Sequence, residues 1–106
     1  MKITRLAEAP NIPFALDGKV ILKSDDLEII HLRLNPGQKL ENHRNPFDTV
    51  FYILEGQAII ETMDGVALAE PDMIIELNQT AERSVLNTGA TDFRMLVLKK
   101  IKTVDK

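Results

Sequence analysis

Hydrophobic residues in this 106-residue chain occur in short runs, and many of them alternate with polar residues at every second position. This period is that of a β-strand, in which successive side chains point to opposite faces. In Leu27–Leu34 it places three apolar residues on one face: Ile30, Leu32 and Leu34. Together the runs predict about eight strands. Their ranges are Lys19–Leu22, Leu27–Leu34, Thr49–Leu54, Gln57–Met63, Val66–Ala69, Met73–Leu77, Arg83–Leu86 and Phe93–Lys99.

Turn residues separate these runs at regular intervals. Pro36-Gly37, Glu55-Gly56 and Asn87-Thr88-Gly89 each follow an apolar run. Asp64-Gly65 lies between two predicted strands and predicts a tight hairpin in which both of these residues adopt positive φ. Helical signal is confined to Asn78–Val85, which could form a helical turn but lacks a sustained 3.6-residue stripe. The pattern therefore predicts an all-β sandwich or barrel.

Several of the predicted strands are apolar on both faces. One face must fill the interior, and the other must be covered by a second sheet or by a partner subunit. A homodimer is the expectation that follows. The chain contains no repeat and no linker, so residues 1–106 are expected to form a single domain with one core.

Composition narrows the functional classes. Hydrophobic residues make up 44% of the chain, which is typical of a globular protein, and the net charge of -3 argues against a nucleic-acid footprint. A basic cluster near the end of the chain is expected to be a solvated strand edge: Lys99, Lys100, Lys102 and Lys106. There is no cysteine, which excludes disulfides and thiolate catalysis. We see neither a signal peptide nor an apolar run long enough to span a membrane, so the expectation is a soluble cytoplasmic protein.

A segment in the middle of the chain begins and ends with glycine and has informative spacing. Five residues separate Gly37 from His43, and one more separates His43 from Asn45. Three residues then lead to Thr49, and six to Gly56. This frame resembles, without a gap, the first motif of the cupin superfamily, which has glycine, histidine, histidine, glutamate and glycine at these distances. His43 matches the first histidine, whereas Asn45 and Thr49 replace the second histidine and the glutamate.

The second cupin motif is present in outline over about residues 71–87. Pro71 stands where the family has its first glycine. Counting back from Asn87 places Arg83 at the position of the motif's histidine, whereas counting forward from Pro71 places Glu82 there. We prefer Arg83, because the turn that begins at Asn87 is the sharper anchor. The resemblance extends over roughly residues 27–98.

The resemblance implies a double-stranded β-helix, or jelly-roll barrel, with its site inside. In the family, two histidines, a glutamate and a third histidine suit a transition metal and leave positions open for substrate. His43 is the only motif ligand retained here, so no complete metal site is implied. The cofactor is therefore either none or a divalent transition metal.

An arginine at a metal-ligand position changes the expected chemistry. A guanidinium repels metal ions, and its planar fork of donors requires an anionic partner when buried. If Arg83 points inward, the pocket is expected to bind a carboxylate or a phosphate. If it points outward, it is an ordinary surface arginine, and the sequence leaves both interpretations open. His31, which no motif includes, is expected to be half-exposed, and a site shared with His43 requires neighbouring strands.

Three hypotheses for function follow. The first is a barrel with a degenerate metal site that binds a small polar or anionic molecule, in a pocket lined by His43, Asn45, Thr49, Glu82 and Arg83. The second is a metal-dependent oxygenase, decarboxylase or isomerase with an unusual set of ligands. The third is a metal-free isomerase or epimerase of sugars or keto acids, with His43 as the catalytic base.

Overall fold

The computed structural model describes residues 1–13, 16–44, 46–79 and 81–101, with the backbone alone for residues 42–44. Within these ranges the regular elements are one short 3₁₀-helix, η1 (Leu6–Glu8), and nine β-strands. The strands are β1 (Asp17–Lys23), β2 (Leu27–Leu34), β3 (Lys39–Arg44), β4 (Asp48–Glu55), β5 (Ala58–Thr62), β6 (Gly65–Ala69), β7 (Ile74–Leu77), β8 (Glu82–Leu86) and β9 (Phe93–Lys100). No helix of the described residues has the length and apolar character needed to cross a bilayer.

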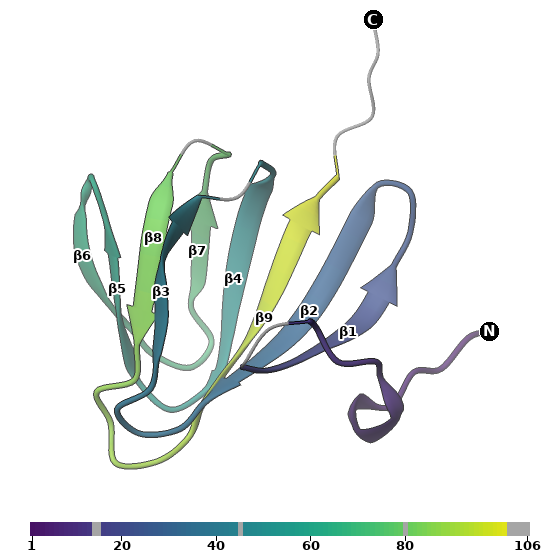
Figure 1. Ribbon diagram of the computed structural model, residues 1–106, viewed down its shortest axis with the longest axis horizontal. Helices are drawn as coiled ribbons and strands as arrows, with labels where there is room; N and C mark the ends of the chain where they lie inside the picture. The colour runs from purple at the N-terminus through teal and green to yellow at the C-terminus, as the bar shows by residue number, and fades with distance from the viewer. Residues whose placement is uncertain (14–15, 45, 80, 102–106) are drawn as a thin grey trace, which may run out of the picture.

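The strands form two antiparallel sheets. The five-stranded sheet has the order β1-β2-β9-β4-β7, and the four-stranded sheet has the order β3-β8-β5-β6. Strands distant in the sequence are neighbours, such as β2 with β9 and β3 with β8, because the chain crosses repeatedly between the sheets (Figure 1). The predicted all-β jelly-roll architecture is confirmed.

Each predicted strand is present, with ends that shift by one or two residues. The alternation failed to predict only β3, whose sequence KLENHR contains a single large apolar residue, Leu40. Its register with β8 places Leu40 opposite Val85 and His43 opposite Arg83. Hydrogen bonds to β8, rather than local propensity, therefore define this strand.

Two local predictions need correction. The hairpin between β5 and β6 exists, but Thr62 pairs with Gly65, so its turn residues are Met63 and Asp64. The expected helical turn does not extend over Asn78–Val85: the N–H of Ala81 donates to the carbonyl oxygen of Asn78 at 3.1 Å and closes one turn, and the rest of the segment pairs as β8 with strands on both sides. Pairing with neighbouring strands satisfies the backbone there and outweighs a weak helical preference.

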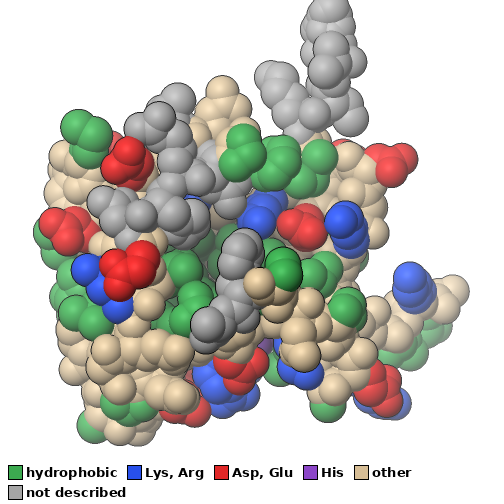
Figure 2. All heavy atoms as spheres, viewed as in Figure 1, with side chains coloured by type: hydrophobic (Ala, Val, Ile, Leu, Met, Phe, Trp, Pro, Cys, Tyr) green, Lys and Arg blue, Asp and Glu red, His purple; other side chains and the backbone are tan. Residues whose placement is uncertain are grey.

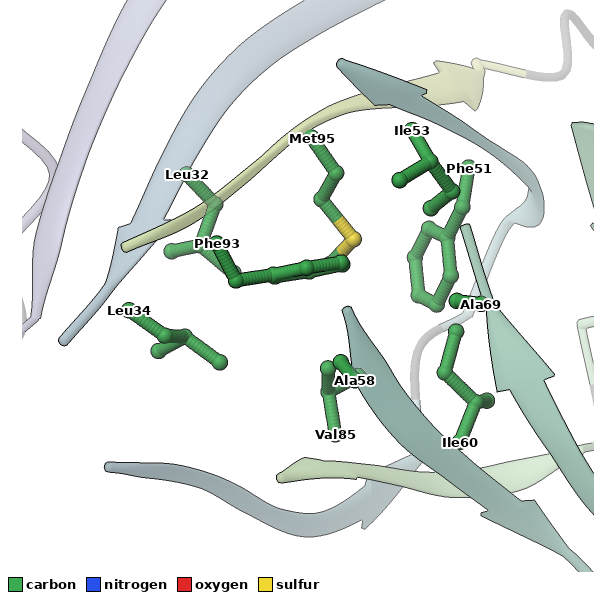
Figure 3. Close-up of a cluster of buried hydrophobic side chains, with 10 residues drawn as sticks. All are labelled: Leu32, Leu34, Phe51, Ile53, Ala58, Ile60, Ala69, Val85, Phe93 and Met95. Atoms are coloured by element: carbon green, nitrogen blue, oxygen red, sulfur yellow. The ribbon is translucent and has the colours of Figure 1, made fainter. Parts of the chain in front are cut away.

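The core lies between the two sheets. Its members are fully or almost fully buried and come from both layers, and they point toward one another in Figure 3. They are Leu32, Leu34, Phe51, Ile53, Ala58, Ile60, Ala69, Val85, Phe93 and Met95. The predicted inward face of β2 is confirmed, since Leu32 and Leu34 belong to this core, and alternate residues of β9, Phe93 and Met95, supply two more of its side chains.

A buried asparagine joins the two sheets at the end where β2 and β8 finish. The Nδ2 of Asn87 donates to the carbonyl oxygens of Leu34 and Thr91, at 2.9 Å each. Its Oδ1 accepts from the N–H of Gly89 at 2.8 Å. The backbone of Asn87 also pairs with Gly37 and Gln38. One side chain thus satisfies three backbone groups from the end of one sheet and from the loop after β8.

The two glycines that bound the first motif have different physical reasons to be glycine. Gly37 has φ +82° and open space where a Cβ would be. Gly56 has φ +81°, and a Cβ there would overlap the carbonyl oxygen of Asp92. Gly37 therefore serves a turn alone, whereas Gly56 serves a turn and a close approach of two backbones.

Alanine substitutions should separate these two roles. Gly37→Ala should cost about 1 kcal/mol in free energy of unfolding, because it introduces only left-handed strain. Gly56→Ala should cost about 3 kcal/mol or more, because a backbone carbonyl must also move. Urea unfolding at one fixed protein concentration measures both. Equal losses in the two variants would contradict the assigned close approach.

Candidate functional site

A cavity of about 550 Å³ lies between the two sheets. This volume is in the range of small-molecule sites. Its wall is mainly apolar, from Ile12, Leu16, Ile30, Leu32, Leu40, Phe51 and Val97, and its charged lining consists of Lys39, Glu41, Arg83 and Lys99. Figure 2 shows hydrophobic and basic side chains together on the face turned to the viewer, between the two sheets.

Arg83 is the largest of the described side chains that are fully buried, with only 1% of its surface exposed. It lies on β8, an inner strand of the four-stranded sheet, where its neighbours across the strands are His43 and Thr62. Alternation along β8 places Arg83 on the same face as Val85, which belongs to the core. The guanidinium is therefore held inside the barrel at the cavity wall.

The buried guanidinium is poorly satisfied by the part of the chain that the structure describes. Its Nη2 donates to the carbonyl oxygen of Asn78 across a long 3.4 Å, and its buried Nε has no hydrogen-bond partner. Burial lowers the pKa of Arg83 from its usual value. A buried donor without a partner costs about 1–3 kcal/mol, and more when it is charged. The folded chain therefore contains a buried charge whose hydrogen-bonding capacity its described residues only partly satisfy.

The other charged groups of the cavity carry charges of both signs. Lys99 lies 3.6 Å from the carboxylate of Glu28, and both side chains are mostly covered. Lys39 and Glu41, one cation and one anion, are both exposed on β3. Arg83 is the buried cation of the lining, and none of the ion pairs found among the described residues includes it.

Thr49 and Glu82, which were predicted for the pocket, are not among the residues that line this cavity. Thr49 is buried, and its Oγ1 donates to the carbonyl oxygen of Phe47 at 3.0 Å, a local structural bond. Glu82 is half-buried and precedes Arg83 on β8, so alternation directs it to the opposite face of the sheet.

The remaining predicted pocket residues are His43 and Asn45. Asn45 lies outside the described residues, and for His43 only the backbone is described. That backbone pairs directly with Arg83 in the β3–β8 ladder, so the two positions are neighbours.

A transition metal does not fit the part of the site that is described. A bound divalent ion needs several neutral or anionic ligands, and no three histidine, aspartate or glutamate side chains cluster in the described ranges. Thr49 replaces a carboxylate, and the buried cation of Arg83 faces the cavity. We therefore derive no chemistry through a metal.

Some lining residues were missed by the sequence analysis. Lys99 was expected at a solvated edge, but it lies largely covered at the cavity. The alternation of Phe93, Met95 and Val97 carries the inward face to position 99 and could have found it. No sequence pattern indicates Ile12 and Leu16, because they line the cavity from a segment that precedes the first strand.

His31 is buried rather than half-exposed, with 4% of its surface accessible. It lies on the outer face of the five-stranded sheet, where the Nη1 of Arg94 donates to its Nε2 at 2.9 Å. Nε2 accepts only when the ring is neutral. Burial, and then the positive charges of Arg94 and Arg33, lower the pKa of His31, while Asp17 opposes them. His31 therefore serves the sheet and not the cavity.

Comparisons with known proteins agree with this architecture. The family model described as Cupin domain matches residues 30–99. No curated protein gave a significant sequence match. Among solved structures, TT1209 from Thermus thermophilus is 26% identical with a TM-score of 0.79, over 94% of this chain and 97% of that chain.

Two further structures differ from each other in their stated activity. A predicted oxalate decarboxylase from Thermotoga maritima is 16% identical with a TM-score of 0.84, over 95% of this chain and 100% of that chain. The polyketide cyclase RemF from Streptomyces resistomycificus is 13% identical with a TM-score of 0.83, over 96% of this chain and 80% of that chain. These similarities show a shared fold and no single shared activity.

The neutral state of His31 predicts how stability depends on pH. Its pKa in the folded state lies below that of the unfolded chain, near 6.5. Below pH 6.5 the unfolded state therefore binds more protons than the folded state. The contribution of His31 to the free energy of unfolding is complete above that pH and is lost as the pH falls. For one titrating group, the free energy of unfolding changes by at most about 1.4 kcal/mol per pH unit.

Urea unfolding between pH 8 and 5.5 measures this slope. His31→Gln should flatten it, because an amide oxygen still accepts from Arg94 but does not titrate. His43 is the only other histidine, so His43→Gln is the matched control and should leave the His31 component in place. An unchanged slope in His31→Gln would contradict the assignment.

Proposed function

The chain belongs to the cupin family, and we propose that it is a ligand-binding barrel that holds a small polar or anionic molecule against Arg83. One observation carries the proposal: a fully buried guanidinium lines the cavity, and its Nε has no partner in the described part of the chain. A buried charge is retained only at a cost, and an anionic ligand offsets that cost.

The chemistry of arginine supports an anion over a neutral ligand. A guanidinium offers parallel N–H donors that match two oxygens of one carboxylate or phosphate. Its charge persists at every physiological pH, so the site does not require protonation to attract an anion. His43 and Asn45 stay predictions as additional pocket residues, whereas Thr49 and Glu82 do not line this cavity.

Of the enzymatic alternatives, the metal-free one is favoured by one observation. The backbone of His43 pairs directly with Arg83, so a candidate base occupies the position beside the proposed anion anchor. A keto acid bound through its carboxylate would suit this pair. The metal-dependent alternative finds no ligand cluster among the described residues.

We also propose that the protein forms a homodimer through the outer face of its five-stranded sheet. The register places Ile29, Leu98 and Val50 in one row across three strands, with Leu96 beside Tyr52 in the next row. These side chains are only half-buried in the single chain. A second copy that packs on this face would remove a continuous apolar surface from water.

Replacing Arg83 tests the ligand proposal. Arg83→Met should raise the free energy of unfolding of the ligand-free protein by about 1–3 kcal/mol, because it removes an unsatisfied buried charge. The same variant should lose the thermal stabilisation that acetate, benzoate or phosphate gives the wild-type protein. Differential scanning fluorimetry with each anion, at constant ionic strength, measures both effects.

Arg83→Lys is the matched control, since it keeps the charge and loses the planar fork. It should retain a weakened response to anions. An anion response that is unchanged in Arg83→Met would contradict the proposal. A stoichiometric transition metal in protein purified without a tag, lost in His43→Ala, would favour the metal-dependent alternative instead.

A charge on the outer face tests the dimer. Leu98→Glu should convert a dimer to a monomer, because it buries a carboxylate at the proposed interface. Leu68→Glu is the matched control, since Leu68 is an exposed leucine on β6 of the other sheet, and it should leave the dimer intact. Sedimentation velocity at micromolar concentration gives the mass, with circular dichroism to verify folding. A monomeric wild-type protein would overturn this proposal.

A further inference from the structure

We infer that the ligand is an amphipathic monocarboxylate, with one carboxylate on Arg83 and an apolar body in the cavity. The inference rests on the proposed anion site and specifies its chemical class. Two independent observations lead to it: the balance of charges around Arg83 and the chemical character of the wall.

The charge balance indicates a ligand with a single negative charge. In the lining, Lys99 is paired with Glu28 at 3.6 Å, and the exposed Lys39 and Glu41 carry opposite charges. The formal charges of these four residues sum to zero, and Arg83 adds one buried positive charge. A carboxylate neutralises it with two oxygens on the guanidinium. A phosphate monoester carries about -1.5 to -2 at neutral pH, so it would leave excess negative charge buried.

The wall indicates that the rest of the ligand is apolar. The described side chains that line the cavity are aliphatic, aromatic or charged, and none of them carries a hydroxyl or an amide. A sugar in this space would lose hydrogen bonds to water and find few replacements for them. Ile30, Phe51 and Val97 lie at one level of three adjacent strands and form a continuous apolar floor.

The segment before β1 extends this wall on one side. The N–H of Ile12 donates to the carbonyl oxygen of Gly18 at 2.9 Å, and that of Val20 donates to Pro10 at 2.8 Å. These bonds hold Ile12 against β1, and Ile12 and Leu16 complete the lining there. The apolar part of the cavity therefore continues past the sheet edge and away from β8, which gives a chain or ring room to extend from the head group.

A series of ligands tests the inference on the intact protein. Acetate, butyrate, hexanoate, hexanamide, gluconate and inorganic phosphate are titrated while protein NMR spectra are recorded at pH 7.5. Each methylene buried should tighten binding about threefold, so hexanoate should bind roughly 100-fold more tightly than acetate. Hexanamide, gluconate and phosphate should each bind at least about tenfold more weakly than hexanoate.

Two variants test separately the contact to the ligand's carboxylate and the contact to its apolar part. Arg83→Met should abolish the preference for hexanoate over hexanamide. Val97→Thr keeps the shape of the side chain and replaces one methyl group of the floor with a hydroxyl. It should weaken the binding of hexanoate several-fold and leave the binding of acetate unchanged.

The outcomes distinguish this inference from the function on which it rests. If acetate and hexanoate bind equally well, and both lose affinity in Arg83→Met, the inference of an apolar ligand body is wrong. The proposed anion site would still be supported. Gluconate or phosphate binding more tightly than hexanoate would lead to the same two conclusions. If no anion binds in an Arg83-dependent way, the anion site fails, and this inference fails with it.

Discussion

The buried amide of Asn87 sets the geometry on which the cavity depends. Its bond to Leu34 joins the end of β8 to the end of β2 in the opposite sheet, and its bond to Thr91 holds the loop that leads to β9. β8 is an inner strand that pairs with β3 and β5, so hydrogen bonds on both sides hold it in place along its length. Arg83 lies four residues before Asn87 on the same face of the strand. The hydrogen bonds of Asn87 therefore help to determine how deeply the guanidinium of Arg83 lies in the barrel.

The fold could be predicted largely from alternation, because inward faces must be apolar in a two-layer protein. Ile30, Leu32 and Leu34 were assigned to the interior by this rule and are buried. β3 could not be found in this way, since its backbone bonds come from β8 and its side chains are mostly polar. The hairpin after β5 was found but displaced by one residue, because turn chemistry indicates a turn more reliably than it fixes the register.

The candidate site could be predicted only in part. Spacing back from Asn87 identified Arg83, but it could not decide which way the side chain points, because that depends on which strands flank β8. The structure gives a buried guanidinium at a cavity wall. Lys99 follows from extending the alternation of β9 by one step. Ile12 and Leu16 were beyond reach, since their place in the wall arises from how the segment before β1 folds back along that strand.

The unsatisfied guanidinium also has a consequence for the lifetime of the protein in a cell. A buried charge without a partner weakens the empty barrel, and an occupant that pairs with it strengthens the folded state by mass action. Proteolysis that proceeds through opened molecules slows as their population falls. The abundance of the protein would then rise with the concentration of the proposed ligand without any change in synthesis, because degradation slows as the ligand binds.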